Sequence, residues 1–171
     1  MKVHGSEVLD HVVDEGVQIY GGMGYSAEAP MERAYRDARI NRIYEGTNEI
    51  NRMVVVDIIL KRALKGEIDF MSAAKNVAKE LMTIPDTNGH DIGIFTKEKQ
   101  YVKNFKKSVL MVLGAAAKNL TTNLKNEQEV LMNVADMIIE TYVSESILLR
   151  VEKLTDLRGE DACMTQIGMM K

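Results

Sequence analysis

The stretch YEGT (44–47) places one carboxylate beside a glycine, between two segments with strong helical patterns. Glu45 therefore lies on backbone that can turn sharply and approach a ligand closely. Thr47 is a good helix N-cap, and the free N–H groups that begin the following helix favour anions and phosphates. A carboxylate held at such a junction suits a general base in a dry pocket. The spacing alone also fits a surface turn with an incidental glutamate.

A glycine-rich stretch, QIYGGMGY (18–25), could also bring backbone close to a phosphate. It follows no strand pattern and lacks the G-x-G-x-x-G spacing, so a Rossmann dinucleotide-binding loop is excluded. The alternative for this stretch is a helix C-cap. The next segment repeats an arginine at every third position, which suits either anion binding or salt bridges on a solvated face. These arginines are Arg33, Arg36, Arg39 and Arg42.

Composition argues against three other kinds of site. His4, His11 and His90 have no ligand spacing among them, and the single Cys163 rules out an internal disulfide or a cysteine cluster, so we assign no metal. A net charge of −3 argues against a nucleic-acid surface, and the lysine-rich stretch 97–107 is broken by acidic and apolar residues. No run approaches the roughly 18 apolar residues of a membrane span.

Apolar periodicity predicts that helices position these residues. The first helix is expected over 6–20, with an apolar stripe that includes Val8, Val12 and Val13, and GGMGY should end it. The second should open at Pro30 and run to about residue 41, and the third should follow Thr47 and end near residue 66.

Three more helices are expected over residues 69–82, 97–123 and 127–157. Pro85 and the turn signal Asn88-Gly89 should end the first of these. The polar joint NLKNEQE predicts that the other two form an antiparallel pair. The predicted fold class is all-α, with a boundary near residues 65–70.

The ordered set VDEGVQIYGGMGY, PMERAYRDARI and NRIYEGTNEINR resembles the closing segment of the C-terminal helical domain of the acyl-CoA dehydrogenase family. The resemblance covers residues 1 to about 65. The E-G-T-N-E-I form and the helical extension beyond it look more like the very-long-chain branch. The resemblance implies that residues 1–66 are the closing helices of that domain and that residues 67–171 are a truncated helical extension domain. Because the sequence ends inside a helical pattern, we expect it to be a fragment of a longer chain.

The resemblance implies dehydrogenation of a fatty acyl-CoA to trans-2-enoyl-CoA by a flavoprotein that uses FAD. Glu45 matches the catalytic base that removes the α-proton of the thioester while the flavin takes a hydride from the β-carbon. Gly46 matches a substrate-binding position whose lack of a side chain leaves room for the acyl-CoA. The positions that match cofactor-binding residues are Gln18, Gly21, Gly22, Thr47, Asn48 and Glu49. In the family, the residues around Gln18 reach the FAD of a neighbouring subunit.

The resemblance also implies a homo-oligomer, either dimer or tetramer, with electron-transfer flavoprotein as acceptor, in the bacterial cytoplasm or the mitochondrial matrix. Most of the flavin pocket lies outside this chain, so we expect the fragment to bind neither FAD nor acyl-CoA usefully. Mixed charge over 67–171 favours packing against the core or a partner subunit over a membrane surface. Two alternatives stay open: a structural or oligomerisation module in which Glu45 only caps a helix, and an acyl-CoA oxidase.

Overall fold

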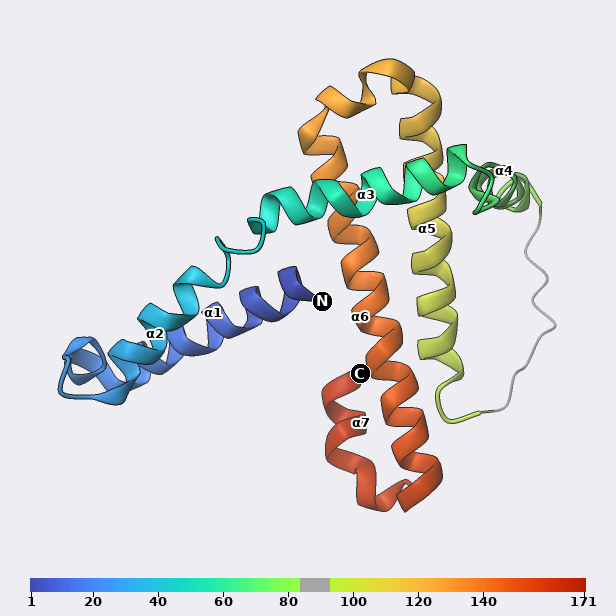
Figure 1. Cartoon of the computed structure of the whole chain (residues 1–171). Coiled ribbons are helices and arrows are strands. Elements are labelled where there is room, and N and C mark those ends of the chain that lie inside the picture. Colours follow the sequence, from blue (N-terminus) through green and yellow to red (C-terminus); the bar gives the residue numbers. More distant parts are fainter. Residues whose placement is uncertain (84–92) are drawn as a thin grey trace. The chain divides into compact units, whose positions relative to one another are not determined.

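The computed structural model describes residues 1–83 and 93–171, and every regular element in these two ranges is an α-helix or a 3₁₀-helix (Figure 1). The predicted all-α fold class is therefore confirmed. The chain divides into two compact units, Met1–Ile58 and Ile59–Lys171. In the same two ranges, no helix combines the length and the apolar character needed to cross a membrane.

The division between these two compact units falls within one helix, α3 (Asn48–Leu64). The helix α3 continues without a break from the first unit into the second and ends at Leu64, and Gly66 follows with a φ of 74°. The functional division into 1–66 and 67–171 stays a prediction.

The first unit is built from α1 (Lys2–Tyr20), η1 (Gly21–Tyr25), α2 (Pro30–Ile40) and the start of α3. The predicted glycine cap is confirmed, because Gly21 has a φ of 60° and its N–H donates to the Gln18 carbonyl. Pro30 opens α2 as predicted. The helices α1 and α2 lie side by side (Figure 1). Their approach is close, since a Cβ at Gly16 would lie 2.8 Å from the Met31 sulfur.

The apolar stripe of α1 is only partly covered. Val13 is buried, whereas Val8 and Val12 are about half exposed. One neighbouring helix, α2, covers only a narrow part of a helix surface, while the predicted stripe is wider than that.

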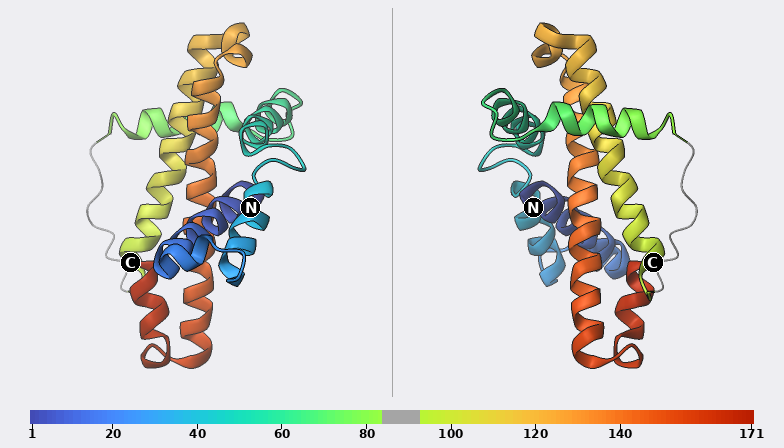
Figure 2. Two further views of the ribbon diagram at one scale, coloured as in Figure 1. Left: turned by 90° about the vertical axis from the view of Figure 1, so that its left-hand side faces the viewer. Right: turned by 90° about the vertical axis from the view of Figure 1, so that its right-hand side faces the viewer.

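Among its described residues, the second unit contains the end of α3 and six further elements. These are α4 (Phe70–Glu80), α5 (Thr96–Leu120), η2 (Thr121–Asn126), α6 (Gln128–Arg158), η3 (Asp161–Cys163) and α7 (Met164–Met170). The helices α5 and α6 form the predicted antiparallel pair, joined by η2, and α7 folds back along the end of α6 (Figures 1 and 2).

One core of the second unit lies where α5, α6 and α7 meet, and its buried members are Phe95, Val102, Leu148, Val151, Cys163 and Ile167. Within the predicted α5 stripe, Leu113 and Ala116 are also buried, but Phe105 and Val112 are exposed. The Asp69 carboxylate caps α4 by accepting from the Ser72 N–H at 3.3 Å. The predicted end signals at Pro85 and Asn88-Gly89 lie outside the described residues.

Candidate active site

Glu45 lies at the corner between α2 and α3, with its side chain exposed. Among the described residues it is the single non-glycine residue with a positive φ, 56°, and Gly46 follows with a φ of 80°. The left-handed conformation costs a residue such as Glu roughly 1–2 kcal/mol. Strain of this kind is concentrated at functional sites, so the corner carries a signal that the bare sequence motif did not.

The backbone N–H of Glu45, an exposed residue, has no hydrogen-bond partner among the described residues. Over the described parts of the chain, the hydrogen bonds around the corner are made by neighbouring groups, such as Asn48 N–H to the Arg42 carbonyl at 3.1 Å, and none uses the Glu45 N–H. A free N–H beside a carboxylate can donate to a carbonyl oxygen while the carboxylate accepts a proton. This pair of groups is the chemistry that the corner offers.

Thr47 caps α3, as predicted. Its hydroxyl oxygen accepts from the Ile50 N–H at 3.2 Å. The pKa of Glu49 lies below its usual range, first because its own backbone N–H donates to the carboxylate and next because the Thr47 hydroxyl does. An ionised Glu49 in the first turn is favourable for the helix dipole and can only accept hydrogen bonds from a ligand.

Asn48 is 2% exposed, and its side chain is turned toward α1. Its Oδ1 accepts from Lys2 Nζ at 2.8 Å, and its Nδ2 donates to Ser6 Oγ at 2.9 Å. A buried amide satisfied in this way would lose these bonds if it turned to a cofactor. A contact between Asn48 and FAD therefore stays a prediction for its main-chain atoms alone.

Two ion pairs tie α1 to the two sides of the corner. Arg52 of α3 lies 2.8 Å from a Glu7 oxygen, and Arg42 lies 3.2 Å from Asp10. Burial acts to raise the pKa of Glu7, but the hydrogen bond and charge of Arg52, with Asn48 and then Arg42, outweigh it and the pKa is lowered. Glu7 is thus held as a carboxylate between α1 and α3.

Two of the four regularly spaced arginines form ion pairs within α2. Arg33 pairs with Asp37 and Arg36 with Glu32, with both partners four residues apart, and both arginines are exposed. Arg42 pairs instead with Asp10 of α1. The alternative of a solvated, salt-bridged face therefore describes Arg33 and Arg36.

A shallow pocket of about 280 Å³ opens beside Glu45. Its wall includes Lys2, Ser6, Leu9 and Tyr44, and the Tyr44 hydroxyl donates to the Asn41 side chain. The volume lies just below the roughly 300–1,000 Å³ that small-molecule sites enclose. The first unit therefore has a small open hollow beside Glu45.

The glycine group around Gln18 lies at the opposite end of α1 from this pocket. Lys2, whose Nζ donates to the Gly46 carbonyl at 2.8 Å, and Gln18 are sixteen residues apart on one helix. At 1.5 Å per residue this is a separation of ~24 Å. Gln18, Gly21 and Gly22 are exposed, and neither glycine has a heavy atom within 4 Å of a built Cβ. The structure thus leaves them open to a ligand but does not bring them to Glu45.

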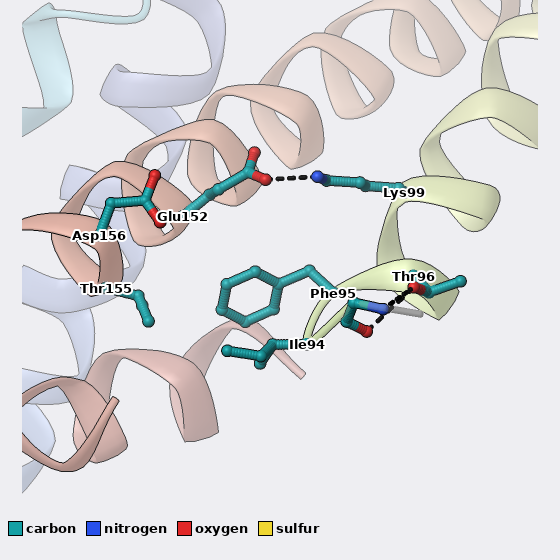
Figure 3. Close-up of a pocket in the computed structure, with 8 residues that line it drawn as sticks. Ile94, Phe95, Thr96, Lys99, Glu152, Thr155 and Asp156 are labelled. Atoms are coloured by element: carbon teal, nitrogen blue, oxygen red, sulfur yellow. Dashed lines mark hydrogen bonds and ion pairs between the residues drawn. The ribbon is translucent and has the colours of Figure 1, made fainter. Parts of the chain in front are cut away.

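A second polar pocket, in the second unit, has no comparable chemistry (Figure 3). Lys99 and Glu152 form an ion pair across it, and the buried Thr155 donates to the Val151 carbonyl at 2.9 Å. These groups are already paired with one another. Over residues 1–83 and 93–171, no three His, Cys, Asp or Glu side chains are grouped as metal ligands.

Sequence reasoning missed the residues that hold the corner in place: Lys2, Ser6, Glu7 and Asn51. The first three lie more than 40 positions from their partners in α3, so no local spacing points to them. Asn51 had a local signal, since it stands four residues after the capping threonine and can reach back to the carbonyls of the turn.

Comparison with known proteins places this helical segment and its corner in a family. Two family models match, each described as acyl-CoA dehydrogenase, C-terminal domain, over residues 1–60 and 104–171. A relative from Bacillus subtilis (strain 168), named "Probable acyl-CoA dehydrogenase", is 47% identical over 167 residues, which are 97% of this chain and 28% of the relative. The human mitochondrial short-chain specific acyl-CoA dehydrogenase is 50% identical over 60 residues, 35% of this chain and 15% of the relative.

A crystal structure of an acyl-CoA dehydrogenase complexed with FAD, from Bacillus anthracis, has a TM-score of 0.90 and 46% identity. The match covers 97% of this chain and 28% of that one. The chain belongs to the acyl-CoA dehydrogenase family, through the C-terminal domain of that family. It spans less than a third of the length of each of these relatives.

Proposed function

We propose that this chain is the C-terminal part of a flavin-dependent acyl-CoA dehydrogenase, in which Glu45 is the general base. The observation that carries the proposal is the corner itself: an exposed carboxylate on left-handed backbone, beside an N–H that no group of the described chain uses. Glu45 would take the α-proton of a fatty acyl-CoA thioester, and the C–H electron pair would become the new double bond. The product would be trans-2-enoyl-CoA.

The α-proton of a thioester is a weak acid, so the base needs help. The Glu45 N–H would donate to the thioester carbonyl and stabilise the negative charge that develops on its oxygen. Gly46 would let the acyl-CoA lie against bare backbone. Bound FAD would accept the hydride that leaves the β-carbon. Shape and charge at the pocket beside Glu45 are compatible with these roles, since it joins an ammonium, a phenol and a carboxylate to an apolar wall.

The exposed ends of the first unit fit an FAD contact in part. Thr47 and Glu49 offer a helix N-terminus, and Gln18, Gly21 and Gly22 offer open backbone. Asn48 would contribute its main chain only, because its side chain is bonded to α1. The separation of ~24 Å along α1 supports the proposal that the two groups serve two cofactors, one in the same subunit and one in its neighbour. The active protein would then be a homo-oligomer, with electron-transfer flavoprotein as acceptor.

The length of the match to the Bacillus subtilis relative supports the proposal that this chain belongs to a branch of the family with an extra helical domain, like the very-long-chain enzymes. The Bacillus subtilis relative matches through residues that follow α3, whereas the human short-chain enzyme matches 60 residues only. Since 167 residues are 28% of the first and 60 residues are 15% of the second, the first relative is the longer protein. We propose that residues 67–171 pack against the core or a partner subunit.

The test is anaerobic mixing of the full-length protein with palmitoyl-CoA while the flavin absorbance is followed at about 450 nm. Wild type should bleach, and Glu45→Gln should slow bleaching by roughly 10²–10⁴-fold at normal flavin content. The matched control is Glu28→Gln, another exposed glutamate of the first unit, which should bleach like wild type.

Three results would contradict the proposal. If Glu45→Gln bleaches at the wild-type rate, Glu45 is not the general base. If the wild-type protein is yellow but never bleaches, its substrate belongs to a different class. A colourless protein that FAD cannot reconstitute leaves the structural module. Rapid reoxidation of the reduced flavin by oxygen would instead assign the oxidase alternative.

A further inference from the structure

The backbone conformation at Glu45 requires contacts that stabilise it. Two successive residues, Glu45 and Gly46, have φ values of 56° and 80°. Glycine adopts such values freely, but glutamate does not. A free chain would leave this conformation at Glu45, and a residue stays there only when surrounding contacts determine it.

Asn51 supplies those contacts from the first turns of α3. Its Nδ2 lies 2.7 Å from the Gly46 carbonyl oxygen and 3.1 Å from that of Thr47, with the Glu45 carbonyl further away at 3.4 Å. A carboxamide nitrogen carries two hydrogens, so the two nearer carbonyls take one each. The Asn51 backbone N–H also donates to the Thr47 carbonyl, at 2.9 Å, which fixes where the side chain begins.

The absence of a side chain at Gly46 allows the Asn51 amide to come this close to the backbone. A Cβ at position 46 would lie 3.1 Å from Asn51 Nδ2, tighter than ordinary van der Waals contact. Lys2 gives the same carbonyl a second donor at 2.8 Å, but through an ammonium on a flexible stem. The planar amide of Asn51 is therefore the group that sets the orientation of the Gly46 peptide.

We propose that Asn51 is a positioning residue for the base: by binding the Gly46 and Thr47 carbonyls it fixes the left-handed corner and so aims the Glu45 carboxylate and N–H. The inference rests on the proposed function of Glu45. The chemical reason is that the carboxylate and the N–H of Glu45 must contact the same thioester at the same time. A shift of about 1 Å in such a pair costs roughly 100-fold in rate.

The experiment uses the full-length flavoprotein with palmitoyl-CoA and with palmitoyl-CoA deuterated at the α-carbon. Asn51→Leu keeps the size of the side chain and removes both donors, while Asn51→Gln keeps a donor. The matched control is Val13→Ala, which loosens the first unit at a buried position of α1 away from the corner. Flavin content, KM and the rate of bleaching are measured for each variant.

Asn51→Leu should bleach roughly 10–100-fold more slowly. Its flavin content and KM should stay near wild type, and its α-deuterium isotope effect should be larger, because proton removal has become slower. Asn51→Gln should recover part of the rate. Val13→Ala should change neither the rate nor the isotope effect. A loss of folded protein alone would lower flavin content and leave the isotope effect where it was.

A second measurement does not use turnover. Amide hydrogen exchange of the Asn48 N–H, which spans the corner to the Arg42 carbonyl, should be faster in Asn51→Leu and unchanged in Val13→Ala. A wild-type bleaching rate and isotope effect in Asn51→Leu would overturn the inference while Glu45→Gln still confirmed the base. Normal bleaching by Glu45→Gln would overturn the proposed function and this inference with it.

Discussion

Glu45 occupies a conformation that a glycine would adopt without strain. Its side chain is exposed, so the fold gains little from the carboxylate. A residue that strains the backbone and is not needed for packing is expected where function requires that side chain. At the next position the residue type suits the backbone, since Gly46 has both a positive φ and a close neighbour in Asn51.

Glu45→Gly should therefore keep or slightly increase the stability of the chain, by up to about 1 kcal/mol, while activity of the full-length protein is lost. Gly46→Ala is the matched comparison and should lower stability by roughly 1–3 kcal/mol, because alanine is strained at this φ and crowds Asn51. Urea unfolding of the chain measures both. A clear loss of stability in Glu45→Gly would mean that the glutamate side chain makes a stabilising contact.

Polar contacts join the helices α1 and α3. The buried amide of Asn48 meets Lys2 and Ser6, and the Arg52–Glu7 pair lies beside it. A hydrogen bond to a charged partner is worth more than a neutral one, and the loss of one partner leaves the other unsatisfied. The position of α3, and with it the corner, thus depends on the charge of Glu7.

This dependence predicts a response to acid. The pKa of Glu7 is lower in the folded chain than its usual value, so the unfolded chain binds this proton first. The contribution of Glu7 is present above the unfolded pKa, about 4.3, and is lost as the pH falls through the lower folded value. Glu7→Gln should flatten the fall in stability below about pH 5. Urea unfolding against pH measures it, with the exposed Glu15→Gln as control; equal slopes in wild type and Glu7→Gln would contradict it.

The proposed site residues do not form one closed pocket within the described residues of this chain. Its pocket at Glu45 is shallow, and the two groups that match cofactor contacts lie at opposite ends of α1. Large apolar side chains are exposed on several helices, including Val12, Ile19 and Tyr25 of the first unit. Exposed apolar surface of this kind is covered in a larger assembly or by association.

We therefore expect the chain by itself to show no saturable FAD binding and to associate as its concentration rises. Flavin fluorescence during a titration tests the first point, and sedimentation at several concentrations tests the second. The control is the full-length protein, which should hold FAD and keep a fixed oligomeric mass. Saturable FAD binding by the chain, or a constant monomer mass, would contradict the corresponding expectation.

The sequence by itself determined the helices α1 to α6, the Gly21 and Thr47 caps, the turn at Glu45 and the family, because periodicity, caps and ordered motifs are local properties of the chain. It did not point to the short helix α7. It did not determine which apolar positions are buried, since burial of Val13 but not Val12 depends on which helix lies opposite. Nor did it determine the inward turn of Asn48, because Asn48 and Ser6 are 42 positions apart. Only the tertiary structure decided these features, along with the left-handed backbone of Glu45, because each depends on contacts that the folded chain must first bring together.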